Sequence, residues 1–191
     1  GEGGMVTTDD DDIADSVRRM RSHGMTSVTL DRYRGRSSSY NVIDKGFNYR
    51  LDEIRGALGI VQLDQLLNAN QQRRRVFDRF RKNLASFAEI DVVAPRATEQ
   101  SACHILPTIL APDLDRNSFM AAMTKRGVQT SVHYPPSHLF QYHREILHCG
   151  PGDLPKSEDV GLREVTLPLY PTLKNDDVDY VCETVAEALV A

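Results

Sequence analysis

Hydrophobic residues near the start of the chain return at helical spacing. Ile13, Val17 and Met20 lie three or four residues apart, with an acidic run at 9–12 before them and Gly24 after them. Negative charge in a first turn stabilises the positive end of the helix dipole, and glycine is common just beyond a helix. The pattern predicts one short amphipathic helix.

The segments around this helix show other patterns. Met5–Thr8 favours a strand, whereas residues 25–46 are rich in Ser, Arg, Gly and Tyr and keep no period, which is typical of a long ordered loop or an interaction segment. From Asp52 to about Ala85 apolar residues return every three or four positions. This last pattern predicts one long helix.

After Phe87 the chain alternates between strand and helix patterns, which predicts a compact α/β sandwich with its boundary near residue 86. Glycine and capping residues mark the ends of the expected helices. The expected strands are His104–Leu110, Val128–His133 and a short extended segment at Leu167–Pro171. The expected helices are one that Asp115 caps and Gly127 ends, one around Ser157–Arg163, and one that Asn175 caps, with Val178, Val181, Val185 and Leu189 on one face.

Composition narrows the class of protein. The 191 residues are 40% hydrophobic and 26% charged, with a net charge of −4, which indicates a globular protein and gives no support to binding of nucleic acid or an anionic membrane. No apolar run approaches the roughly 18 residues of a membrane helix, and Gly1–Gly4 lacks the pattern of a signal peptide. The three cysteines are odd in number and widely spaced, so we expect free thiols and a cytoplasmic location.

Self-contained catalytic motifs are not apparent in the sequence. The histidines His133, His138, His143 and His148 recur every five residues, a spacing that neither a helix nor a strand gathers on one face, so no metal site is expected. The arginine run Arg73–Arg75 would be spread around a helix, which favours a solvated surface. The segment Gly46–Arg50 is different, because it places an amide and a guanidinium at the entrance of the long helix.

Two interpretations of Gly46–Arg50 follow from its chemistry. Asn48 and Arg50 could bind a phosphate, since helix N-termini and charge-assisted hydrogen bonds both favour anions. Alternatively, Arg50 pairs with Asp52 or Glu53 while Asn48 only shapes the turn. The residues taken alone favour the second interpretation.

Five ordered blocks carry a family resemblance over nearly the whole chain. The sequence is similar to DegT/DnrJ/EryC1/StrS sugar aminotransferases at Gly1–Met5, Arg21–Gly24, Gly46–Glu53, Ser131–Tyr134 with His138, and Leu167–Pro171. The resemblance implies the C-terminal portion of the aspartate-aminotransferase type (fold type I) α/β fold of transferases that depend on pyridoxal phosphate (PLP). It implies a remnant of the large cofactor domain at 1–45, a cofactor-contacting loop and long interdomain helix at 46–86, and the small α/β sandwich domain at 87–191.

The resemblance also implies roles for particular residues. The aldimine lysine is expected upstream of Gly1, so no catalytic residue is expected in this chain. Asn48 resembles the residue that reaches the PLP phosphate of the neighbouring subunit in a homodimer, with Arg50 as its companion. His133, Tyr134 and His138 resemble the loop that lines the nucleotide-sugar pocket. Cys103 departs from the family, whose members usually have an aromatic residue there.

The implied reaction transfers an amino group, usually from glutamate, to a keto sugar on a nucleotide carrier. Without the lysine this portion alone would be inactive. Two alternatives stay open: a sugar dehydratase of the same fold, in which histidine replaces the lysine, and a non-catalytic regulatory or dimerisation module.

Overall fold

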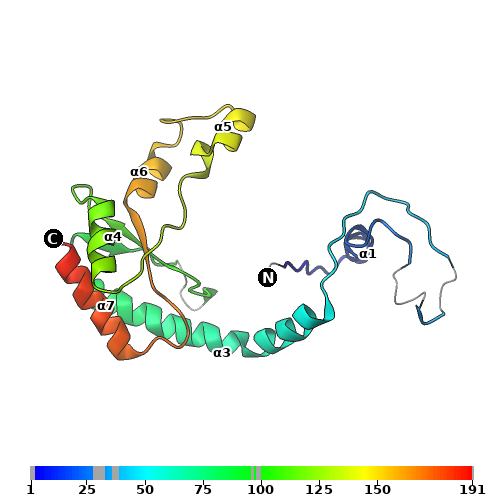
Figure 1. Cartoon of the computed structure of the whole chain (residues 1–191), viewed down its shortest axis with the longest axis horizontal. Helices are drawn as coiled ribbons and strands as arrows, with labels where there is room; N and C mark the ends of the chain where they lie inside the picture. The colour runs from blue at the N-terminus through cyan, green and yellow to red at the C-terminus, as the bar shows by residue number, and fades with distance from the viewer. Residues whose placement is uncertain (1–2, 28–32, 36–38, 96, 98–99, 191) are drawn as a thin grey trace. The chain divides into compact units, whose positions relative to one another are not determined.

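The computed structural model describes residues 3–27, 33–35, 39–95, 97 and 100–190 (Figure 1). The chain divides into two compact units, Gly1–Asp64 and Gln65–Ala191. The division falls within the long helix α3 (Glu53–Leu84), so this one element contributes to both units.

The first unit contains the predicted short helix, α1 (Asp11–Met20). Asp10 caps it by accepting a hydrogen bond from the Ile13 N–H at 3.0 Å, while acidic residues occupy the first turn and Arg18 and Arg19 the last. These contacts satisfy an otherwise unpaired amide and complement the helix dipole. The sequence pattern therefore located α1 correctly.

The strand predicted at Met5–Thr8 is wrong. These residues form no strand, and both Met5 and Val6 are exposed. A strand requires a neighbour for its hydrogen bonds, and the described part of the chain places none beside this segment.

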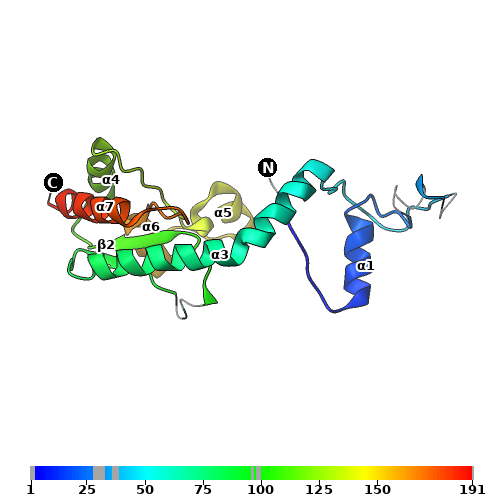
Figure 2. The ribbon, with the colours of Figure 1, turned by 90° about the horizontal axis from the view of Figure 1, so that it is seen from below.

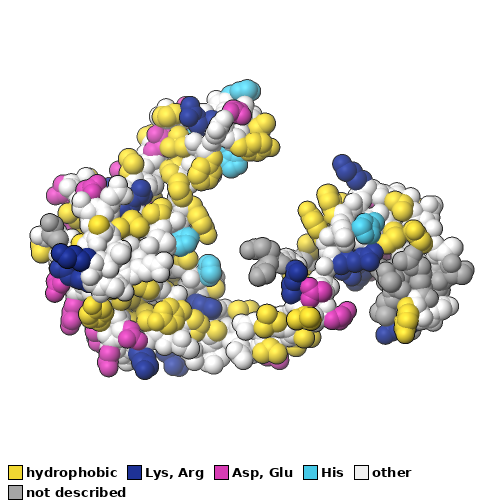
Figure 3. All heavy atoms as spheres, viewed as in Figure 1, with side chains coloured by type: hydrophobic (Ala, Val, Ile, Leu, Met, Phe, Trp, Pro, Cys, Tyr) yellow, Lys and Arg dark blue, Asp and Glu magenta, His cyan; other side chains and the backbone are white. Residues whose placement is uncertain are grey.

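Helix α3 confirms the long helix predicted from 52 to 85. Asp52 caps its start, accepting a hydrogen bond from the Arg55 N–H at 2.9 Å. The last turns bury Val76, Phe77, Phe80 and Leu84. The first turns instead expose apolar side chains, which Figure 3 shows in yellow. These exposed residues are Ile54, Leu58, Ile60, Val61, Leu63, Leu66 and Leu67.

The second unit contains a three-stranded antiparallel sheet in the order β1-β2-β3. Strand β1 spans Ile90–Val92, β2 spans Leu106–Leu110 and β3 spans Glu164–Leu167. Burial alternates along β2, with Leu106, Thr108 and Leu110 buried, whereas all four residues of β3 are buried. The sheet therefore has β2 at its centre and a wholly buried strand at one side.

Four helices and one 3-10 turn complete the described part of this unit after β2. They are α4 (Arg116–Lys125), the 3-10 turn η2 (Ser137–Leu139), α5 (Gln141–Leu147), α6 (Pro155–Arg163) and α7 (Asn175–Ala188). Figures 1 and 2 show α7 beside the later turns of α3, where Asp179 accepts hydrogen bonds from Arg79 and, at 2.8 Å, from Asn83. Asp115 caps α4 through a 2.8 Å bond from the Ser118 N–H, as predicted.

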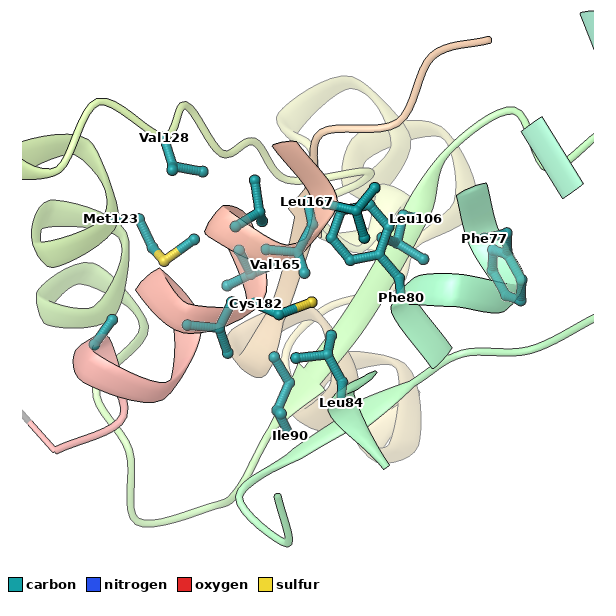
Figure 4. Close-up of a cluster of buried hydrophobic side chains, with 14 of the residues drawn as sticks. Phe77, Phe80, Leu84, Ile90, Leu106, Met123, Val128, Val165, Leu167 and Cys182 are labelled. Carbon is teal, nitrogen blue, oxygen red and sulfur yellow. The ribbon is translucent and has the colours of Figure 1, made fainter. Parts of the chain in front are cut away.

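One hydrophobic core joins these elements. In Figure 4, Phe80 of α3, Leu106 of β2 and Leu167 of β3 converge, with Cys182 of α7 beside them. Burial raises the pKa of the Cys182 thiol to about 11, so the thiol stays protonated at neutral pH. The cysteines are free thiols, as expected, with Cys103 and Cys182 buried and Cys149 half-buried.

Three predicted elements in this unit need correction. In Val128–His133 only Ser131 makes a strand-like pair, an isolated bridge with Thr166, so this segment is mostly not a strand. The extended segment predicted at Leu167–Pro171 overlaps β3 only at Leu167. The strand residues before it, Glu164–Thr166, were not predicted, because Glu164 and Thr166 are polar yet buried. Helix α7 is capped one residue earlier than predicted, at Lys174.

Truncation of Phe80 tests the core. We expect Phe80→Ala to lower the free energy of unfolding by about 3–5 kcal/mol, because the ring is 0% exposed and its removal leaves a cavity. Urea unfolding followed by circular dichroism measures the change. Leu162→Ala, at an exposed position of α6, is the control and should change stability by less than about 0.5 kcal/mol; equal losses would contradict this assignment of the core.

Candidate functional site

Two segments far apart in sequence lie side by side in the first unit. The His23 N–H donates to the Phe47 carbonyl at 2.9 Å, and the Tyr49 N–H donates to the Arg21 carbonyl at 2.9 Å. Ser22 and Asn48 face each other between these bonds as an antiparallel bridge. The second and third blocks of the family resemblance thus form one structure.

Glycines permit this close approach. Gly24 has a φ of +70°, and a Cβ on it would lie 1.9 Å from the Asp44 carbonyl oxygen. A Cβ on Gly46 would lie 2.0 Å from the backbone nitrogen of Gly24. Because both obstructions are backbone atoms, a side chain at Gly24 or Gly46 would force the two segments apart.

Asn48 and Arg50 lie on the exposed side of this structure. The Arg50 Nε donates to the Ser22 hydroxyl at 3.0 Å, and Ser22 is 2% exposed. Asp52, one of the two partners considered for Arg50, makes an ion pair with Arg55 at 2.8 Å. The contact with Ser22 therefore fixes Arg50 relative to the preceding helix.

The donor set here suits a phosphate. A guanidinium presents its N–H donors in a planar fork, and an asparagine amide adds two more donors. The Phe47 and Tyr49 rings, on either side of Asn48 in the sequence, stack with their centroids 5.1 Å apart and an interplanar angle of 11°. An exposed cation with a neighbouring amide is the chemistry that binds phosphate oxygens through charge-assisted hydrogen bonds.

His133 and Tyr134 belong to the second unit. They follow Ser131, which forms an isolated bridge with Thr166, on the same segment of the chain. The His133 N–H donates to the Glu164 Oε2 at 2.9 Å, and the Ser131 hydroxyl lies 3.3 Å from His133 Nδ1. Tyr134 is 71% exposed, with its ring edge-on to the imidazole at 4.9 Å. This end of the segment leaves His133 half-buried and exposes Tyr134.

His138 has a different environment from its two predicted companions. It is 6% exposed, and its Nε2 lies 3.0 Å from Glu158 Oε1. Glu158 also accepts hydrogen bonds from the Gly152 and Leu154 amides, at 2.9 and 3.3 Å. The hydrogen bond with His138, supported by these amides, holds the pKa of the Glu158 carboxyl below its ordinary value. The contact ties η2 to α6, while a substrate role for His138 stays a prediction.

Sequence reasoning missed the residues that hold these side chains in place. Ser22 lay within a quoted block but carried no signal of its contact with Arg50, 28 positions away. Glu158 and Glu164 looked like ordinary acidic residues of a helix and a loop. Glu164 differs from an ordinary acidic residue only in the folded structure, where it lies in a strand whose four residues are all buried.

Two searches of the described residues gave negative results. No group of three or more His, Cys, Asp or Glu side chains in the described ranges could hold a metal ion. Among the same residues, no helix combines the length and hydrophobicity that crossing a membrane requires.

Solved structures define the class of fold. The chain matches PseC of Helicobacter pylori, an aminotransferase of pseudoaminic acid biosynthesis, with a TM-score of 0.84 and 23% identity, over 96% of this chain and 47% of that one. It matches the putative sugar aminotransferase Spr1654 of Streptococcus pneumoniae in its PMP form with a TM-score of 0.84 and 26% identity, over 96% and 46% of the two chains. Spr1654 is also known in a PLP form. The fold is that of the C-terminal portion of PLP-dependent sugar aminotransferases, which confirms the predicted fold class.

Sequence comparison identifies the family. The sequence model of the DegT/DnrJ/EryC1/StrS aminotransferase family matches residues 1–186. A protein of Methanocaldococcus jannaschii, the uncharacterized MJ1066, is 31% identical over 182 residues, which are 93% of this chain and 47% of the relative. The chain belongs to the DegT/DnrJ/EryC1/StrS family, whose aminotransferases depend on PLP, and it spans about half the length of the relatives it matches.

Substitution of Gly46 tests the paired segments. We expect Gly46→Ala to speed hydrogen exchange of the His23 and Tyr49 amides at least about tenfold, because the new Cβ would strike the backbone of Gly24. Exchange followed by NMR or mass spectrometry measures this. Gly59→Ala is the control, since a Cβ there meets nothing within 4 Å; unchanged exchange in Gly46→Ala would contradict the contact.

The Glu158 contacts predict a dependence on pH. A depressed carboxyl pKa stabilises the fold at pH values above the ordinary 4.5, and this contribution is lost as the pH falls through the lower folded value. Glu158→Gln should therefore reduce the exchange protection of the Gly152 and Leu154 amides at pH 7, with the difference from wild type shrinking below pH 4.5. Glu145→Gln, on the exposed side of α5, serves as control. A difference independent of pH would refute the role of the charge.

Proposed function

We propose that this chain is the C-terminal portion of a PLP-dependent aminotransferase that transfers an amino group from glutamate to a nucleotide-linked keto sugar. Residues 1–45 belong to the cofactor domain, 46–86 form the cofactor-contacting loop and linking helix, and 87–191 form the small domain. The enzyme is a cytoplasmic homodimer with active sites at the subunit interface. The lysine that links the cofactor lies upstream of Gly1, so this portion alone is inactive.

The pairing of Arg21–Gly24 with Gly46–Arg50 carries the proposal. Family membership gives the reaction class, and this pairing gives the chain a surface suited to the cofactor's phosphate. Ser22 fixes the Arg50 guanidinium at one side, and the Ser22–Asn48 bridge fixes the position of Asn48. In the dimer, Asn48 and Arg50 hold the phosphate of the cofactor bound by the neighbouring subunit.

The second unit supplies the side that faces the sugar. Tyr134 is exposed and His133 is half-buried, and hydrogen-bonding groups of this kind suit a polar carbohydrate or its nucleotide. His138 supports the same loop through Glu158. His133 and Tyr134 therefore bind and orient the keto sugar, and His138 supports the loop that carries them.

The cofactor, when bound, supplies the electron sink for amino-group transfer. The residues of this chain contribute position and charge. Arg50 and Asn48 neutralise and orient the phosphate, which fixes the cofactor at one end. His133 and Tyr134 bind and orient the sugar.

Substitutions in the full-length protein test the phosphate site. Arg50→Ala and Asn48→Ala should each weaken PLP binding, Arg50→Ala by about tenfold or more because a hydrogen bond to a charged group contributes about 1.5–3 kcal/mol. The measurement is the absorbance of protein-bound PLP during cofactor titration. Arg55→Ala is the matched control, since this arginine lies one turn further on and pairs with Asp52.

Transfer of nitrogen from ¹⁵N-glutamate tests the reaction itself. We expect the label in the sugar when a nucleoside diphosphate 4-keto-6-deoxyhexose is the acceptor. Unchanged PLP affinity in both site variants would overturn the roles of Asn48 and Arg50. Loss of the hydroxyl from the sugar without incorporation of nitrogen would overturn the aminotransferase proposal in favour of the dehydratase.

A further inference from the structure

The Glu164 carboxylate of β3 is buried, and it forms no ion pair with any residue that the structure describes. The residue is 4% exposed, and its neighbours in the strand, Val165 and Leu167, are apolar core residues. Burying a carboxylate is costly unless hydrogen bonds satisfy its oxygens. The contacts of Glu164 therefore show what it does in the fold.

Each carboxylate oxygen has its own donor. Oε2 accepts from the backbone N–H of His133 at 2.9 Å, and Oε1 accepts from the Thr166 hydroxyl at 2.5 Å. Thr166 also pairs with Ser131 through two backbone bonds, of 2.8 and 3.1 Å. Strand β3 thus bonds to Ser131 through the Thr166 backbone. Two residues further along the segment it bonds to the His133 amide through the Glu164 side chain.

The bond from the His133 amide to the Glu164 side chain stands where a longer β ladder would have a backbone bond, because the ladder consists of the Ser131–Thr166 pair alone. Beyond the Ser131–Thr166 bridge the backbone of the segment no longer pairs with β3. The His133 amide, the next one on the same side of the extended segment as that of Ser131, would therefore lack a strand partner. The Glu164 side chain supplies the missing acceptor at the residue where the chain turns toward solvent and exposes Tyr134. A buried anchor of this kind fixes the direction in which His133 and Tyr134 leave the core.

We propose that Glu164 is a positioning residue for substrate selection, which sets the backbone at His133 and thereby the orientation of His133 and Tyr134 toward the sugar. The proposal rests on the proposed function, because it takes these two side chains as the sugar-binding pair. Glu164 itself touches neither substrate nor cofactor. Its loss should weaken binding of the keto sugar while leaving the reaction with glutamate nearly unchanged.

Three variants of the full-length protein separate positioning from general support of the fold. Glu164→Ala leaves the His133 amide without its acceptor. Glu164→Gln can keep both contacts, since its amide oxygen accepts from His133 and its NH₂ donates to the Thr166 hydroxyl. Thr108→Val is the matched control: Thr108 is also buried in the sheet, where its hydroxyl donates to the Val165 carbonyl at 2.6 Å and does not contact the His133 segment.

Kinetics with glutamate and a nucleoside diphosphate 4-keto-6-deoxyhexose give the first readout. For Glu164→Ala we expect KM for the sugar to rise about tenfold or more, because His133 and Tyr134 lose their fixed orientation, with less than about a twofold change in the glutamate half-reaction. Glu164→Gln should restore most of the sugar affinity, and Thr108→Val should leave KM for the sugar unchanged. Equal losses in both half-reactions, or a Thr108→Val variant as impaired as Glu164→Ala, would overturn the proposal.

Hydrogen exchange of the His133 amide gives a second readout that does not depend on activity. Exchange at least about tenfold faster in Glu164→Ala, but not in Glu164→Gln or Thr108→Val, supports the anchor. If the wild-type enzyme aminates no keto sugar, the proposed function fails, and this exchange experiment still decides whether Glu164 holds the segment. Unchanged exchange in Glu164→Ala would refute the anchor itself.

Discussion

Helix α3 presents Phe77, Phe80 and Leu84 to the sheet, and the second unit depends on the burial of this face. The three side chains enter one core with the inward residues of β2 and β3 and with α7. A sheet with an apolar face must bury that face against another element. Hydrophobic burial supplies most of the stabilisation, and the contacts of Asp179 with Arg79 and Asn83 fix how α7 lies along α3.

Polar contacts then place the side chains that this core does not hold. In each case a residue far away in sequence supplies the acceptor: Ser22 for Arg50, Glu158 for His138 and Glu164 for the His133 amide. Such bonds are directional, so they fix an orientation where apolar packing would only fix a location. The orientation of the candidate site residues thus depends on hydrogen-bond acceptors that lie outside the proposed ligand contacts.

Periodicity and capping residues predicted α1, α3, α4, α6 and α7, as Asp115 shows for α4. They did not predict α5, a helix of seven residues whose N-cap Phe140 makes no side-chain hydrogen bond. Strands were harder to predict, because a strand depends on a pairing partner that no local pattern reveals. Met5–Thr8 has no partner in the described part of the chain, and β1 at Ile90–Val92 is only three residues long. The polar Glu164 made β3 look unlike a buried strand. The resemblance named Asn48 and Arg50, but no pattern could show that Ser22 fixes the guanidinium. Contacts of this kind arise only when the chain has folded.

Gly24 and Gly46 allow the two ends of the segment 25–43 to approach each other closely. Hydrogen bonds between Thr26 and Asn41, and between Gly24 and Ile43, hold the two ends of the loop together. When the ends of a loop are already fixed, doubling its length costs only about 0.6 kcal/mol in closure entropy. Gly24 and Gly46 must stay small, yet the residues between them can be lengthened or shortened cheaply. A change of chain length between Thr26 and Asn41 would therefore leave the segment that carries Asn48 and Arg50 undisturbed.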